Sequence, residues 1–158
     1  MDPRVTACAD RNDWRTTWMW LPELPFPAVM YTVDVEDEVT DDVLRLVPTE
    51  ATSLLIRGPS NTPVRISCKF NNLPNLRDIQ LMAVCEGLEA DSAFEGCTHL
   101  ENLWIGAHAN PLFEQCTHLP MCPLKNFGMN GYGSAMIWSR PFATFMSAHP
   151  EIRHHTVL

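Results

Sequence analysis

An internal repeat with a period of about 25 residues constrains this chain more than any other feature of its sequence. Phe94–Leu100 (FEGCTHL) and Phe113–Leu119 (FEQCTHL) are near copies, and Phe70–Leu76 (FNNLPNL) is a looser third copy. Repeats of this kind are typical of stacked units, because one short unit cannot bury its apolar edge alone. The sequence therefore predicts a stack of short units that share a continuous core.

Each copy ends at a leucine, which is followed by apolar residues three and five positions later. The full sets are Leu76, Ile79, Leu81 and Leu100, Leu103, Ile105, and weaker sets occur one and two periods earlier at Ala51, Leu54, Ile56 and at Phe26, Val29, Tyr31. Alternate side chains of a strand point to opposite faces, so the last two residues of each set are expected to face a shared interior. The pattern predicts one short strand per unit and a parallel sheet.

A short helix is predicted on the return path of one unit. Thr40 is a suitable N-cap, and Asp41 and Asp42 suit the positive end of a helix. Apolar residues then form one face up to Val47, before Pro48 ends the segment. A strand, a turn, a short helix and a second turn fit within one period of the repeat.

These motifs resemble leucine-rich repeats. The Leu-x-x-Leu-x-Leu spacing carries the resemblance, the Phe-x-x-Cys-x-x-Leu run is similar to the BspA-like subgroup, and the helix before Leu54 is similar to the cysteine-containing type found after F-boxes. The resemblance implies an α/β leucine-rich-repeat solenoid, with a parallel sheet on the concave face and short helices or turns on the convex face. It implies about five to six irregular repeats over residues 26–158, and a protein-binding role. Residues 1–25 are interpreted as a tryptophan-rich cap segment that contains Trp14, Trp18 and Trp20.

The repeat register after residue 119 has two solutions. If the near copy is followed, the next strand contains Leu119, Cys122 and Leu124; if the period of 24 is followed, it contains Leu124, Phe127 and Met129. We favour the first, because the duplicated sequence is the more specific match.

Composition and charge exclude several classes of function. Eleven basic and 19 acidic residues give a net charge of −8, which is unfavourable for binding nucleic acid. There is no apolar run long enough to span a membrane and no export signal, so we expect an intracellular protein, cytoplasmic by default, with a mitochondrial location left open. The six cysteines contain no Cys-x-x-Cys pair, so buried thiols are favoured over a metal site and no cofactor is expected.

The sequence contains neither a nucleophile elbow nor a His-Glu-x-x-His motif, and an enzyme is not expected. The favoured hypothesis is a non-catalytic protein-interaction module, as a subunit of a larger complex, that binds its partner through the repeat sheet. The alternatives are an F-box-like adaptor for substrate recognition and a structural subunit of a large organellar assembly.

The candidate partner-binding residues lie at outward positions of the predicted strands. They are Leu55, Gln80, Met82 and Trp104, and the tryptophan is the kind of residue that anchors an interface. The acidic run from Asp34 to Asp42 is interpreted as a solvated turn before a helix in preference to a cation site. The sequence ends inside a predicted strand, so a protein partner or a second copy is expected to cover Ile152 and Val157 in the C-terminal repeat.

Overall fold

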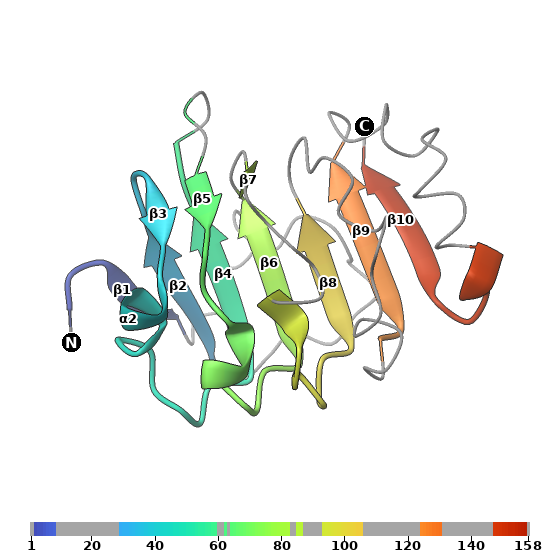
Figure 1. Cartoon of the computed structure of the whole chain (residues 1–158), viewed down its shortest axis with the longest axis horizontal. Helices are drawn as coiled ribbons and strands as arrows, with labels where there is room; N and C mark the ends of the chain where they lie inside the picture. Colours follow the sequence, from blue (N-terminus) through green and yellow to red (C-terminus); the bar gives the residue numbers. More distant parts are fainter. Residues whose placement is uncertain are drawn as a thin grey trace.

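A seven-stranded sheet forms the main layer of the protein (Figure 1). The structure is a computed structural model that describes residues 2–8, 29–59, 62, 64–82, 85–86, 93–105, 124–130 and 147–157. The strands are β1 (Val5–Cys8), β2 (Met30–Asp34), β4 (Ser53–Arg57), β6 (Asp78–Met82), β8 (Asn102–Ile105), β9 (Asn126–Asn130) and β10 (Arg153–Val157), and they lie side by side in chain order. All neighbours are parallel except β1 and β2, which are antiparallel. The prediction of an α/β chain with a mostly parallel sheet is confirmed.

A second, three-stranded sheet accompanies the first and was not predicted. Its strands β3 (Glu38–Val39), β5 (Val64–Ile66) and β7 (Cys85–Glu86) are parallel and adjacent in that order. Figure 1 shows them in front of β2, β4 and β6, with α2 (Asp41–Leu44) and the 3₁₀ helix η1 (Phe70–Asn72) at their lower end. Two or three residues per strand are too few for an alternating pattern to be recognised in the sequence.

The main core lies between these two layers. One continuous apolar cluster combines inward residues of the large sheet, such as Leu54, with Ile66 of β5 and Leu44 of α2. Phe70 and Phe94, which begin two of the sequence copies, are fully buried in it with stacked rings 5.2 Å apart. Equivalent positions of successive units therefore pack on one another, as the repeat predicts.

The register of the central strands is the predicted one. Ile79 and Leu103 are Cα partners on the adjacent parallel strands β6 and β8, and both side chains are buried in the main core. At the first unit the predicted spacing is wrong. Leu54 pairs with Tyr31 and Ile56 with Val33, so the offset there is two positions shorter than predicted and Val29 is not an interior strand position.

The favoured register after residue 119 is also wrong. Phe127 is the Cα partner of Leu103 and is fully buried, whereas Leu124 lies before β9 begins. The period of 24 therefore describes this strand, because it keeps Phe127 in line with Leu103 in the core. Leu119 and Cys122, on which the other solution depends, lie outside the described residues.

The predicted helix start is confirmed. The Thr40 hydroxyl accepts a hydrogen bond of 3.3 Å from the backbone N–H of Val43. The helix is shorter than predicted and ends at Leu44, although Val47 is still buried against the core.

The first and last strands of the sheet test the predicted N-terminal cap and the predicted partner at the C-terminal repeat. Of the predicted cap segment, the structure describes residues 2–8, in which β1 pairs with β2 in antiparallel orientation. The three tryptophans of this segment lie outside the described residues. Ile152 was expected to require a partner to cover it, but it is only 5 % exposed within this chain. The expectation is wrong for Ile152, and the side chain of Val157 lies outside the described part.

Gly96 is required by its backbone conformation. Its φ is +80°, and a Cβ added there would lie 3.1 Å from the side-chain nitrogen of Asn71. We expect Gly96→Ala to lower the free energy of unfolding by roughly 1–2 kcal/mol, since an L-residue with a side chain is strained in this region. Chemical denaturation would measure the loss. The exposed neighbour variant Glu95→Ala should change it by less than about 0.5 kcal/mol, and equal losses in both variants would contradict the argument.

Candidate functional site

The predicted partner-binding column exists but is not an open surface. Leu55, Gln80 and Trp104 are consecutive Cα partners on β4, β6 and β8, as expected. Their exposures, however, are 0 %, 1 % and 5 %, and half-buried Met82 packs against a second small apolar cluster of Met30 and Leu55. A sheet buried on both faces is usual for parallel strands. These four residues are therefore not retained as the site where a partner binds.

A buried polar ladder lies beside this column. Ser53, Asp78, Asn102 and Asn126 occupy the same position of four successive strands. Ser53 Oγ donates to Asp78 Oδ2 at 2.6 Å, Asn102 Nδ2 donates to Asp78 Oδ1 at 2.5 Å, and Asn126 Nδ2 donates to Asn102 Oδ1 at 2.7 Å. All four residues are at most 7 % exposed. The ladder satisfies buried polar groups that would otherwise destabilise the sheet.

One charged residue connects the ladder to the surface. Arg77 precedes Asp78 in the chain, and its Nε lies 3.5 Å from Asp78 Oδ2. The Asp78 side chain is buried, whereas the Arg77 side chain is 44 % exposed. The guanidinium thus supplies a counter-charge for a buried carboxylate while its side chain remains partly exposed.

A polar row, exposed except for half-buried Glu101, runs across the strands at the point where each enters the sheet. Its members are Thr52, Arg77, Glu101 and Lys125, one residue before each member of the ladder. The backbone N–H of Arg77 donates to Thr52 O, that of Glu101 to Arg77 O and that of Lys125 to Glu101 O, at 2.7–2.9 Å. Because these backbones are hydrogen-bonded to one another, the four side chains form one row. Within it, Lys125 Nζ lies 3.6 Å from Glu101 Oε1.

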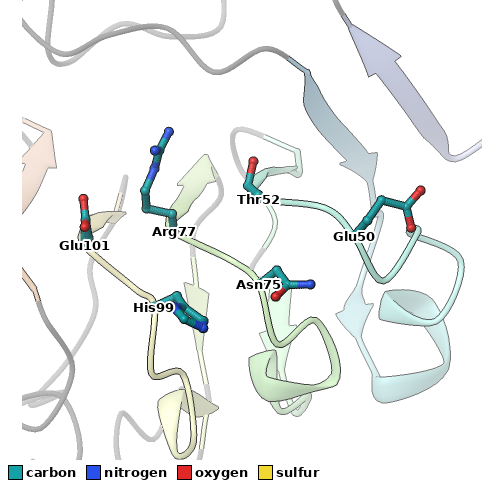
Figure 2. Close-up of a pocket in the computed structure, with 6 residues that line it drawn as sticks. All are labelled: Glu50, Thr52, Asn75, Arg77, His99 and Glu101. Carbon is teal, nitrogen blue, oxygen red and sulfur yellow. The ribbon is translucent and has the colours of Figure 1, made fainter.

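A second row completes a hollow of about 330 Å³ at this edge (Figure 2). Glu50, Asn75 and His99 lie two positions before Thr52, Arg77 and Glu101, and these six residues line the hollow. Figure 2 shows Arg77 extended away from the chain between Thr52 and Glu101, with Asn75 and His99 below them and Glu50 beyond Thr52. The Asn75 side chain is held by a 3.2 Å hydrogen bond to Thr49 O. We name these six residues the strand-entry site.

Sequence reasoning missed the strand-entry site because its residues show no apolar pattern. The signal that could have found it is the repeat spacing itself. Polar residues recur one repeat period apart at two positions, one and three residues before a buried strand begins. In a parallel sheet such positions must line up on one edge.

The acidic run from Asp34 to Asp42 is divided among separate partners. Asp34 accepts a 2.6 Å hydrogen bond from Arg57, which raises the pKa of the arginine, and Glu38 accepts one of 2.8 Å from Ser67. Asp41 accepts the Lys69 N–H and the Asn72 amide. A hollow of about 390 Å³ lies against this run, beside Arg4. The interpretation as a single turn before a helix is correct only in part: Glu36 and Asp37 lie in a bend and α2 begins at Asp41, but Asp34 ends β2 and Glu38 begins β3.

Other chemical features add little within the described ranges. In that part of the chain no group of three or more histidine, cysteine, aspartate or glutamate side chains is arranged to hold a metal ion. Cys68 and Cys97 are buried in the core, as predicted for these two thiols. Among the described residues, no helix has the length and apolar character needed to cross a membrane.

No protein-family model matches this sequence, and no curated protein or solved structure is significantly similar to it.

Proposed function

We propose that this chain is a leucine-rich-repeat-like solenoid that serves as a non-catalytic protein-interaction module and as a subunit of a larger complex. Three features support the solenoid. Strands follow one another in chain order in a mostly parallel sheet and a second, parallel sheet. The pairing of β4 to β9 matches the period of the sequence repeat, and the apolar residues of successive units share one core. Stacked repeats of this kind present equivalent positions of neighbouring units as an extended binding surface.

The observation that carries the binding role is the strand-entry site. Three successive units place six polar side chains around one hollow, and the Arg77 side chain among them is 44 % exposed. Protein interfaces combine hydrogen bonds with complementary charges, and this group of polar side chains around an exposed arginine offers both. The proposed binding surface is therefore the strand-entry edge of the sheet instead of the buried Leu55–Gln80–Trp104 column.

Charge reversal at Arg77 tests this proposal. We expect Arg77→Glu to weaken binding of the native protein partners by about tenfold or more, because a guanidinium inside an interface cannot be replaced by a carboxylate. Partners would be recovered from cells with the tagged chain, identified by mass spectrometry after cross-linking, and then titrated in purified form.

The matched control is Arg45→Glu. Arg45 is an exposed arginine that pairs with Asp42 beside α2 and lies outside the strand-entry site. It should retain every partner at full affinity. The proposal would be overturned if both variants, shown to be folded by circular dichroism, bound the same proteins as tightly as the wild type, or if the wild type bound none.

A further inference from the structure

The charges of the strand-entry site alternate across the strands. Arg77 lies on the middle unit, Glu101 on the next unit and Glu50 on the previous one. Arg77 and Glu101 lie in the same row on neighbouring units, whereas Glu50 lies two positions before Thr52 on the previous unit and is offset from that row along the chain. Neighbouring parallel strands are about 4.8 Å apart, so across the sheet the units of the two glutamates are roughly 10 Å apart, with the unit of Arg77 between them. A ligand that matches this order needs a negative centre and two positive flanks.

Arg77 is suited to hold the negative centre. Its Nε side faces Asp78, and both Asp78 oxygens already accept hydrogen bonds from Ser53 and Asn102. Figure 2 shows the two terminal nitrogens as the outermost atoms of the side chain. A guanidinium presented in this way binds a carboxylate through two parallel hydrogen bonds. The buried Asp78 would keep the guanidinium oriented while it does so.

The flanks favour basic side chains. Glu50 is exposed, and Glu101 is only partly engaged by Lys125 at 3.6 Å. A purely acidic segment would meet two carboxylates here, and a purely basic one would meet Arg77. The net charge of −8 also attracts a partner whose basic residues outnumber its acidic ones.

We infer that the strand-entry site binds an extended segment of a protein partner in which an acidic residue lies between two basic residues, with one residue separating it from each. Side chains two positions apart in an extended chain are about 6.6–6.8 Å apart on one face, so the two basic residues are separated by roughly 13 Å. Long lysine or arginine side chains span the remaining difference of a few ångströms. This inference rests on the proposed function and specifies the chemistry of the partner.

Two short peptides of opposite charge order provide the test. The first is acetyl-Lys-Ser-Glu-Ser-Lys-amide, and the second is acetyl-Glu-Ser-Lys-Ser-Glu-amide. Each would be titrated to about 10 mM into the ¹⁵N-labelled chain, a range that detects dissociation constants near 1 mM. We expect the first peptide to shift the amides of Thr52, Arg77 and Glu101 in a saturable way. We expect its affinity to fall by about tenfold or more when sodium chloride is raised from about 50 to about 500 mM.

Variants then assign the recognition to particular charges. Arg77→Glu should abolish binding of the first peptide, and the neutral variant Arg77→Gln should weaken it, which covers the case in which charge reversal beside Asp78 disturbs folding. Glu101→Gln should also weaken it, whereas Arg45→Glu should have no effect. The inference is overturned if the first peptide shifts none of these amides, or if both peptides shift them with the same affinity. If native partners still depend on Arg77 in that case, the chemistry assigned to the partner is wrong while the binding surface stands.

Discussion

Replacing Leu103 by alanine is expected to lower the free energy of unfolding by roughly 2–5 kcal/mol. Leu103 is fully buried and lies between Ile79 on one neighbouring strand and Phe127 on the other. Truncation would leave a cavity at the centre of the core, and the strands on both sides are held in register by backbone hydrogen bonds and cannot close it. Urea unfolding followed by circular dichroism would measure the loss.

Two control variants distinguish this loss of packing from a general loss of stability on substitution. Leu103→Met nearly conserves the side-chain volume and should lower the free energy by less than about 1.5 kcal/mol. Lys125→Ala removes an exposed side chain and should change it by about 0.5 kcal/mol or less. If Leu103→Ala were as stable as Lys125→Ala, the interior position of this strand would be wrong.

The interior of the sheet was predictable because apolar spacing reports directly on it. Ile79 and Leu103 were assigned to adjacent parallel strands from the period of the repeat, and they are Cα partners. The same period places Phe127, whereas the more specific duplicated sequence pointed elsewhere. Duplication records how a sequence arose, but the register of a strand is set by which side chains fill the core.

The burial of the outward column could have been expected from one local pattern. Leu54, Leu55 and Ile56 form an unbroken apolar run, and all three are buried. A strand with one solvated face alternates apolar and polar residues, while a continuous run is typical of a strand buried on both faces. The repeat period does not reveal this burial, because its apolar sets include only the strand residues that face the main core. The position of Trp104 on the face away from the main core was predicted correctly. A side chain on that face can still be buried, as Trp104 is.

The polar ladder and the strand-entry site could not be predicted from apolar spacing. Ser53, Asp78, Asn102 and Asn126 are ordinary polar residues in the sequence, and only the aligned strands show that each meets the next. The register that aligns them also aligns Thr52, Arg77 and Glu101 one position earlier. Both features follow from the repeat once the strands are known to be parallel and in register.

Replacing Asp78 by alanine is expected to lower the free energy of unfolding by an amount similar to that for Leu103→Ala. The substitution removes both acceptors at the centre of the ladder, so Ser53 Oγ and Asn102 Nδ2 lose their partners in a buried environment. Each buried donor left unsatisfied costs about 1–3 kcal/mol, which gives roughly 2–6 kcal/mol for the pair. Arg77 also loses the carboxylate 3.5 Å from its Nε. Urea unfolding would measure the total.

The variant Asp78→Asn separates hydrogen bonding from charge. An asparagine oxygen can accept from Asn102, and its amide can donate to Ser53 after the serine hydroxyl rotates, so both ladder contacts are kept. Only the negative charge that faces Arg77 is lost. Because that arginine is partly exposed to water, the free energy of unfolding should fall by about 1 kcal/mol or less. If the asparagine variant were as unstable as the alanine variant, the ion pair would be the main stabilising interaction. If the alanine variant unfolded like the wild type, Ser53 and Asn102 would find other partners and the ladder would not stabilise the sheet.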